Sequence, residues 1–209
     1  MTTPDPTLDV AATAGGWLAG AAHGLIFDCD GTLADTMPVH YLAWTAMLAE
    51  HGLVLPQEQF YGLAGMPARA IIRLLADEQH IDVRADEIEP MVTDKELRYI
   101  DLIEHVTPIA VVVEVASRYR GILPLAVASG GDRWVVERTL GAVGILDWFD
   151  AVVCAEDTDR HKPDPDVFLE AARRLGVASE TCVVFEDSDL GLEAARRAHM
   201  VGVDIRTWL

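Results

Sequence analysis

The chain has 209 residues, of which 51% are hydrophobic and 24% are charged, and its formal net charge at pH 7 is −18. This length allows one domain or a core with one insertion, and this composition is typical of a folded globular protein rather than a disordered one. The acidic balance argues against non-specific binding to nucleic acid or to an anionic membrane surface.

The three cysteines, Cys29, Cys154 and Cys182, are widely spaced and form no Cys-x-x-Cys pair. They indicate neither a disulfide framework nor a zinc site, so we expect a reduced, cytoplasmic protein. Residues 10–27 are fairly apolar, but they lack the basic start of a signal peptide and are too short and too broken by glycine to span a bilayer. We interpret residues 1–22 as an N-terminal extension outside the catalytic unit.

Short runs rich in Val, Ile and Leu, bounded by polar residues or glycine, predict buried strands. These runs are residues 25–27, 124–128, 151–155, 182–185 and 201–203. Helical patterns follow the first four of them, at residues 107–120, 132–140, 164–175 and 188–198. The third of these helices ends at the expected glycine, and the first is predicted to start at Thr107-Pro108, a hydroxyl cap followed by proline. Such alternation predicts a parallel sheet covered on both faces, a Rossmann-like α/β core.

The first and second predicted strands are separated by far too much chain for a single crossover. The intervening sequence has helical patterns at residues 39–50, 68–79 and 84–104 and no strand signal. We therefore expect an all-helical insertion, a cap, over residues 39–105. The α/β catalytic core would then consist of residues 23–38 and 106–209.

The stretch Asp28-Cys29-Asp30-Gly31-Thr32-Leu33 follows directly after the first predicted strand. In open α/β sheets, ligands bind at the carboxyl ends of the strands. One of two such carboxylates can attack phosphorus, and the other can protonate the leaving oxygen and then activate water. The glycine lets the backbone turn and present N–H groups to phosphate oxygens. Taken alone, the pattern is also compatible with a helix-capping aspartate and a turn.

Two further strand ends carry groups that suit a phosphate. Ser129 and Gly130 follow the second predicted strand, where a hydroxyl and exposed backbone amides would bind phosphate oxygens. Lys162 precedes a predicted helix, and its point charge suits both a phosphate and a nucleophilic carboxylate. The simpler alternatives are an ordinary serine–glycine turn and a solvated loop lysine.

Glu186 and Asp187 follow the fourth predicted strand. Together with Asp28 they would complete a hard, oxygen-rich Mg²⁺ site, although helix capping is the simpler alternative for this stretch. A protein with this negative charge needs such a cation to bind an anionic phosphate beside several carboxylates. Four strand ends thus carry the groups that one reaction requires.

With these motifs in this order, residues 24–205 resemble the haloacid dehalogenase-like hydrolase superfamily. The chain is most similar to the group with a small helical cap after the first strand, which includes β-phosphoglucomutases and sugar-phosphate phosphatases such as fructose-1-phosphatase. The resemblance implies that Asp28 is the nucleophile that forms an aspartyl-phosphate. It also implies that Asp30 is the general acid and base, with its backbone carbonyl on Mg²⁺.

By the same resemblance, Ser129 and Lys162 hold the transferred phosphoryl group. Asp187 completes the metal site, with Glu186 as a further ligand or as a neighbour of the ligands. Dehalogenases of the family lack a carboxylate at the position of Asp30, so phosphoryl transfer is expected here.

The cap is expected to contribute to substrate choice. The resemblance to the mutases implies that His40 supports leaving-group chemistry and cap closure and that Lys95 contacts substrate. The alternatives are an ordinary polar residue at a helix start for His40 and a solvated helix lysine for Lys95. A mutase also needs a second cationic clamp, for which mutases use an Arg after a cap glycine and a Lys after the serine. Here Arg69 is displaced by one residue, and Asp132 and Arg133 stand where the Lys is expected.

We therefore expect a Mg²⁺-dependent hydrolase of a small phosphomonoester, a sugar phosphate, acting through an aspartyl-phosphate. A β-phosphoglucomutase-type mutase is the alternative, with Arg69 or Arg133 serving as the second clamp. A non-catalytic phosphoacceptor similar to bacterial receiver domains is a more distant alternative, since those domains are much shorter and have no helical insertion. The expected partner is a small phosphorylated metabolite, with neither nucleic acid nor membrane involved. The sugar and the oligomeric state stay open.

Overall fold

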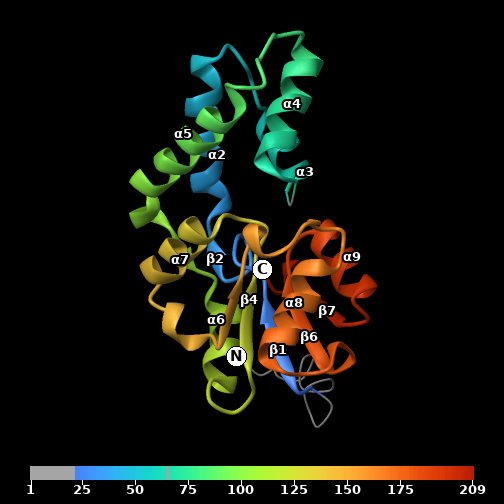
Figure 1. Cartoon of the computed structure of the whole chain (residues 1–209). Coiled ribbons are helices and arrows are strands. Elements are labelled where there is room, and N and C mark those ends of the chain that lie inside the picture. The colour runs from blue at the N-terminus through green and yellow to red at the C-terminus, as the bar shows by residue number, and fades with distance from the viewer. Residues whose placement is uncertain (1–21, 65) are drawn as a thin grey trace.

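The computed structural model describes residues 22–64 and 66–209, so the predicted extension lies almost wholly outside the described residues. Five parallel strands form the central sheet in the order β5-β4-β1-β6-β7 (Figure 1). They are β1 (Gly24–Phe27), β4 (Leu125–Ala128), β5 (Ala151–Val153), β6 (Cys182–Glu186) and β7 (Val201–Asp204). The predicted parallel α/β core is confirmed.

Helices cover both faces of this sheet. They are α6 (Ala110–Tyr119), α7 (Arg133–Ala142), α8 (Asp166–Leu175) and α9 (Asp189–Arg197). Because side chains alternate along a strand, Leu25 and Phe27 of β1 pack in a core with α6 and α7, which includes Val115. Ile26 points to the other face and packs with α8 and α9 around Phe168. The three central strands, β4, β1 and β6, are buried on both sides, which explains their apolar sequences.

A short antiparallel pair joins two segments that are far apart in the chain. Strand β2 (Ala34–Asp35) pairs with β3 (Thr107–Pro108), just before the chain leaves the core and just after it returns. The predicted helix start at Thr107 is therefore wrong, and α6 begins at Ala110. Thr107 and Pro108 are used in the ladder instead, and such a short edge pair tolerates a proline that lacks an N–H.

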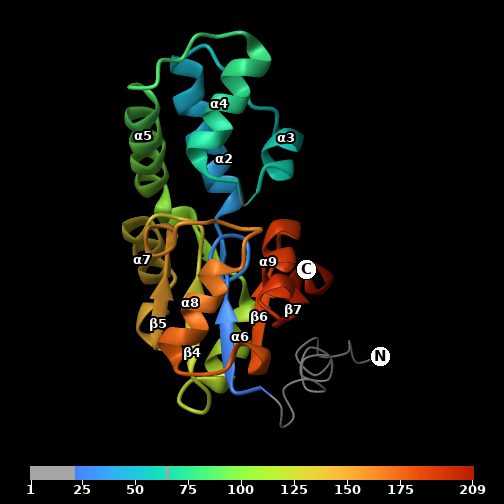
Figure 2. The ribbon, with the colours of Figure 1, turned by 45° about the vertical axis from the view of Figure 1, so that its right-hand side comes forward.

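Four helices lie above the carboxyl ends of the strands, and we call them the cap (Figure 2). They are α2 (Met37–Glu50), α3 (Gln57–Gly62), α4 (Ala68–Gln79) and α5 (Ile88–Asp101). They share a separate apolar core, which includes Trp44, Phe60, Ile72 and Leu75. Helix α3 was not predicted, because its six polar-rich residues are too few to show a helical period. The domain boundaries at residues 39 and 105 stay a prediction.

Three aromatic rings pack in a row beneath the carboxyl end of the sheet. Phe27 stacks on Phe185 with 4.7 Å between ring centroids. Trp208, in the last turn of the chain, packs against Phe185 at 5.9 Å. Since Asp28 and Glu186 directly follow the two phenylalanines, the C-terminal turn supports the strand ends that carry them.

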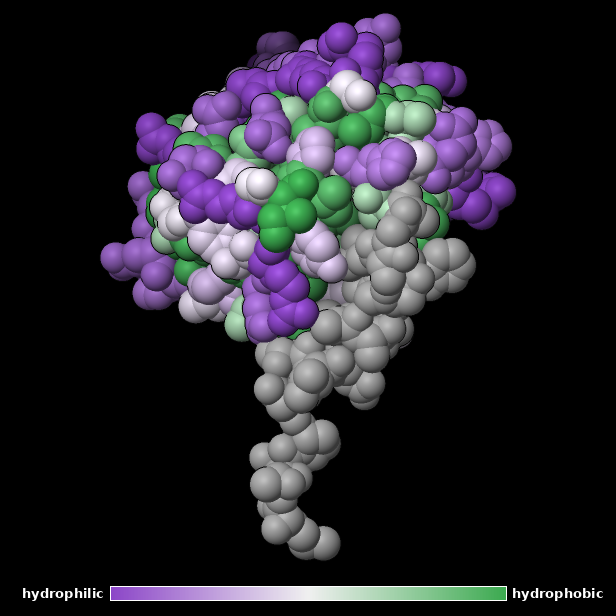
Figure 3. Space-filling model, turned by 90° about the horizontal axis from the view of Figure 1, so that it is seen from below, coloured by the Kyte–Doolittle hydropathy of each residue, from purple (hydrophilic) through white to green (hydrophobic). Residues whose placement is uncertain are grey.

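Within residues 22–64 and 66–209, no helix has both the length and the apolar character needed to cross a membrane. Figure 3 shows the end of the core opposite the cap, where small patches of hydrophobic residues lie among hydrophilic residues. Cys29, Cys154 and Cys182 are all buried and free.

Candidate active site

The register of the central strands brings three sequence motifs to one edge of the sheet. Phe27 of β1 pairs with Val127 of β4 on one side and with Phe185 of β6 on the other. The residues that follow these partners therefore leave the sheet side by side, below the cap. This explains why Asp28, Ser129 and the end of β6 meet, although they are far apart in the sequence.

Lys162 forms the centre of a buried ion-pair network at this edge. Its Nζ lies 2.7 Å from Asp28 Oδ1 and 2.7 Å from Glu186 Oε2. Lys162, Asp28 and Glu186 are all buried. Burial alone lowers the pKa of Lys162, but the two carboxylates raise it above its ordinary value. The lysine therefore stays charged beside the proposed nucleophile.

Three carboxylates here fit a Mg²⁺ ion. Asp28, Glu186 and Asp187 offer oxygen atoms that all lie within 4.8 Å of one another. Burial, and then the negative charge of Glu186, raise the pKa of Asp28 well above its ordinary value and that of Asp187 to about 7. A divalent cation would relieve this repulsion, and an all-oxygen donor set is what Mg²⁺ prefers.

Glu186 already has protein partners on both oxygens. Its Oε1 accepts hydrogen bonds from the backbone N–H of Asp187 at 3.1 Å and from the hydroxyl of Ser188 at 2.8 Å, while Oε2 receives Lys162. The Asp187 carboxylate has fewer hydrogen-bond partners, with the Thr32 hydroxyl donating to Oδ1 at 3.0 Å. The geometry thus favours Asp187 as a metal ligand and Glu186 as the residue that fixes Lys162.

Two glycines let the backbone approach these carboxylates. Gly31 has a φ of +81°, and a Cβ there would overlap the Asp187 carboxylate. A Cβ on Gly191 in α9 would overlap the carboxylate of Glu186. The sequence pattern predicted the turn at Gly31, whereas the role of Gly191 shows only in three dimensions, because it depends on helix-to-strand contact.

Asp30 lines the same cavity as the ion pair and is joined to the cap through His40. The distance between His40 Nε2 and Asp30 Oδ1 is 3.2 Å, and the imidazole stacks on Tyr99 with 3.9 Å between centroids. Burial raises the pKa of Asp30, but the hydrogen bond and charge of His40 lower it overall. An anionic phosphoryl group beside Asp30 would raise its pKa again and favour the protonated form that an acid needs.

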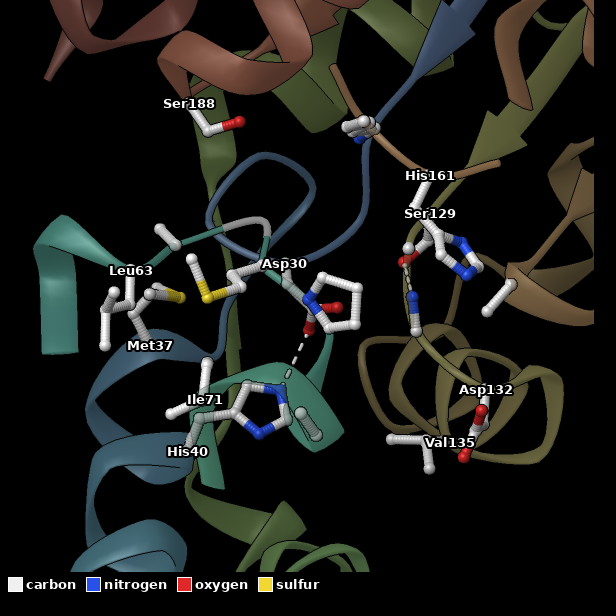
Figure 4. Close-up of a pocket in the computed structure, with 18 of the residues that line it drawn as sticks. Asp30, Met37, His40, Leu63, Ile71, Ser129, Asp132, Val135, His161 and Ser188 are labelled. Atoms are coloured by element: carbon white, nitrogen blue, oxygen red, sulfur yellow. Dashed lines mark hydrogen bonds and ion pairs between the residues drawn. The ribbon is translucent and has the colours of Figure 1, made fainter. Parts of the chain in front are cut away.

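A cavity of about 200 Å³ lies between core and cap and contains these groups. Figure 4 shows Met37, Leu63 and Ile71 of the cap on one side and Ser129 and Asp132 of the core on the other. The core side of the cavity is therefore polar, whereas the cap supplies mainly apolar walls.

The cap cations predicted from the sequence reach this cavity with partners of their own. Arg69 lines the cavity and binds Glu89 through two nitrogens, of which Nη2 lies 2.9 Å from Oε2. Lys95 also lines it, and its Nζ lies 2.8 Å from Glu96 Oε1. Gly130 lines the cavity beside Ser129, as expected for a phosphate-binding loop.

Arg133, which the mutase alternative would use as a second clamp, is not among the residues that line the cavity. Its guanidinium binds the carboxylate of Asp157 and the carbonyl oxygen of Val152, the latter at 3.3 Å. Asp132, one residue earlier, lines the cavity instead. Residue spacing does not indicate which of the two neighbours faces the cavity, because this depends on the direction in which α7 starts.

The haloacid dehalogenase-like hydrolase family model matches residues 23–199, which is most of the chain. The chain belongs to this family. It is 40% identical over 183 residues to the fructose-1-phosphate phosphatase YqaB of Escherichia coli, covering 88% of this chain and 96% of that protein. A phosphorylated carbohydrates phosphatase of Thermotoga maritima is 30% identical, over 83% of this chain and 80% of that one.

Solved structures show the same haloacid dehalogenase-like fold. CbbY of Rhodobacter sphaeroides in complex with phosphate has a TM-score of 0.78 and 26% identity, covering 87% of this chain and 84% of that one. A β-phosphoglucomutase of Clostridium difficile has a TM-score of 0.79 at 24% identity, covering 88% and 84% of the two chains. The predicted family and enzyme class are therefore confirmed.

Proposed function

We propose that the protein is a Mg²⁺-dependent phosphatase that hydrolyses sugar or polyol monophosphates through an aspartyl-phosphate. The observation that carries this proposal is the buried pair of Lys162 and Asp28, with Asp30 facing the same cavity. The similarity to two phosphatases of phosphorylated carbohydrates supports the substrate class. The three buried free cysteines agree with a reducing cytoplasm as its compartment.

In the first step, a carboxylate oxygen of Asp28 attacks phosphorus while the bond from phosphorus to the leaving oxygen breaks. Asp30 donates its proton to that oxygen, so the alcohol departs neutral. In the second step, Asp30 accepts a proton from water, whose oxygen attacks phosphorus and releases phosphate from Asp28. Lys162 and Ser129 hold the phosphoryl oxygens in both steps.

When bound by Asp28 and Asp187, with the backbone carbonyl of Asp30, Mg²⁺ would neutralise charge on the phosphoryl group. The cap would open to admit substrate and close to exclude bulk water. His40 suits this movement, because it belongs to cap helix α2 and bonds Asp30 directly.

The charges around the cavity favour a phosphatase over a mutase. A mutase must hold a second phosphate, which requires free cations away from Lys162. Arg69 and Lys95 each already have a carboxylate partner, and Arg133 binds Asp157 outside the cavity. Water is therefore the favoured acceptor of the phosphoryl group from Asp28.

The test is phosphate release and product analysis on a panel of sugar phosphates with Mg²⁺. We expect free phosphate from one or several hexose or polyol phosphates, and near-complete loss of turnover in Asp28→Asn. Conversion of β-glucose 1-phosphate to glucose 6-phosphate with little free phosphate would show a mutase. Turnover above a few per cent in Asp28→Asn, or full activity in EDTA, would contradict the proposed mechanism.

A further inference from the structure

Asp132 occupies a helix-capping position but does not cap its helix. It directly precedes α7, and its side chain makes no hydrogen bond to the first N–H groups of that helix. The carboxylate instead belongs to the wall of the cavity, on the core side facing the cap (Figure 4). An Asp at this position ordinarily satisfies a helix N–H, so this one keeps its oxygens available for another donor.

The charges that surround Asp132 leave this end of the cavity negative. Burial raises the pKa of Asp132, as do Glu156 and Glu96, whereas Arg69 and Lys95 lower it. The two cap cations are each paired, Arg69 with Glu89 and Lys95 with Glu96. Each of these two pairs is neutral, so neither cation is left to neutralise the Asp132 carboxylate, which faces the cap as a negative charge.

Glu96 provides a second and independent sign that hydrogen-bond acceptors gather here. It is only 9% exposed, and within the described residues its Oε2 has no hydrogen-bond partner. A buried carboxylate oxygen without a donor is costly unless a ligand supplies one. Hydroxyl groups are donors that supply no negative charge of their own.

We propose that Asp132 is a specificity-determining residue that accepts a hydrogen bond from a hydroxyl at the unphosphorylated end of the substrate. The same carboxylate repels a second phosphate or a carboxylate placed there, so neutral sugar and polyol monophosphates are selected. This inference rests on the proposed phosphatase function and adds the chemical requirement at the far end of the substrate. A site built to bond a hydroxyl rejects analogues that lack it.

The test uses two pairs of probes, and the two members of each pair differ only at the unphosphorylated end of the molecule. Glucitol 6-phosphate and 6-phosphogluconate differ by a CH₂OH in place of a carboxylate, and so do glycerol 3-phosphate and 3-phosphoglycerate. The ratio of kcat/KM within each pair measures the preference for a hydroxyl over an anion. p-Nitrophenyl phosphate has no hydroxyl at all, and it measures the chemistry apart from this selection.

We expect the wild-type enzyme to prefer the hydroxyl member of at least one pair, and Asp132→Asn to reduce that preference by roughly tenfold or more. Turnover of p-nitrophenyl phosphate should change by a smaller factor than turnover of the hydroxyl members of the pairs. Asn has nearly the shape of Asp, and the replaced side chain makes no capping hydrogen bond to α7, so the variant should fold. The matched control is Glu137→Gln, one turn along α7 and outside the cavity, which should leave every ratio unchanged.

Three results would overturn the inference while leaving the phosphatase function intact. The first is an unchanged ratio of kcat/KM within the pairs in Asp132→Asn. The second is an equal loss of activity on all substrates, including p-nitrophenyl phosphate. The third is a wild-type enzyme that hydrolyses p-nitrophenyl phosphate but none of the four probes. An equal loss would show that Asp132 acts in cap closure instead. Absence of turnover on every compound, with Mg²⁺ present, would refute the phosphatase function and this inference with it.

Discussion

Glu186 is the residue on which the supporting contacts of the site converge. It accepts bonds from Lys162 and from Ser188, and α9 packs so closely that its residue 191 has no room for a side chain. Contacts of this kind fix a lysine that would otherwise have many rotamers. The cost of disturbing them is therefore expected to show in both stability and turnover.

Gly191→Ala should destabilise the protein by about 1–3 kcal/mol, because the added methyl group overlaps the Glu186 carboxylate. Activity should fall as well, since Lys162 depends on that carboxylate. The measurement is the free energy of unfolding in urea. The matched control is Gly141→Ala in α7, whose Cβ meets nothing within 4 Å and which should gain up to about 1 kcal/mol. Equal effects of the two substitutions would contradict the close contact.

The thiols should be chemically silent in the native protein. Burial raises the pKa of Cys154 to about 12 and that of Cys182 to about 11, so little thiolate exists at pH 8. We expect iodoacetamide to leave both unmodified in the folded protein and to alkylate both in denaturant, as measured by mass spectrometry. Rapid alkylation of either cysteine in the native state would show that the structure around that cysteine opens locally.

The sequence predicted well which residues gather at the carboxyl ends of the strands. It did not predict which of two adjacent residues faces the cavity. Asp28 and Ser129 follow buried strands and Glu186 ends one, and parallel pairing brings such positions together. Asp132 and Arg133 are adjacent, and only one of them lines the cavity. That choice depends on the angle at which α7 leaves its loop, which no spacing in the sequence encodes. The catalytic roles themselves stay predictions until variants are measured.

At the scale of elements, α5 of the cap and α7 of the core are joined by one buried polar contact. The hydroxyl of Tyr99 lies 2.8 Å from Thr139 Oγ1, and neither residue is exposed. Tyr99 also supports the imidazole of His40. The contact therefore ties the position of the cap to the residue that bonds Asp30.

Tyr99→Phe should lower the free energy of unfolding by about 1–3 kcal/mol, because Thr139 loses a buried partner while the ring stays in place. The measurement is the midpoint of thermal or urea unfolding. Tyr61→Phe removes a hydroxyl from an exposed ring and should change stability by less than about 0.5 kcal/mol. A loss of the same size in both variants would count against this role of the hydroxyl.

The sequence indicated all five strands of the main sheet, because each contains a short apolar run, and the three central strands β4, β1 and β6 are buried along their whole length. It missed β2 and β3, whose pairing joins residues 34–35 to 107–108. A two-residue ladder between segments that far apart is a tertiary contact with no local pattern. The error at Thr107 has the same origin, since the ladder outweighs a good local capping signal.

For the whole molecule, the net charge of −18 and the buried carboxylates make cations stabilising in two distinct ways. Any salt screens the general repulsion, whereas Mg²⁺ also binds the site. At equal ionic strength, MgCl₂ should therefore raise the Tm more than NaCl does. Binding at 100 times the Kd adds about 2.7 kcal/mol to stability.

Asp187→Asn should abolish the excess stabilisation by Mg²⁺ and leave the effect of NaCl unchanged. Asp159→Asn, on a surface loop outside the cavity, should retain the full difference between the two salts. Thermal scans in matched salts measure this without any substrate. Equal melting temperatures in the two salts for the wild-type protein would argue against the metal site.

The strand order has a consequence for the moment at which the enzyme becomes active during its synthesis. Strand β1 lies between β4 and β6, so a nascent chain that ends before residue 182 leaves one side of β1 unpaired. Leu25, Ile26 and Phe27 then present an open apolar edge, which invites aggregation or chaperone binding. Glu186 and Asp187 are translated after β1, β4 and the whole cap. The carboxylates at the end of β1 therefore lack their β6 partners until residue 187 has been made, and the site is assembled only when β6 docks beside β1.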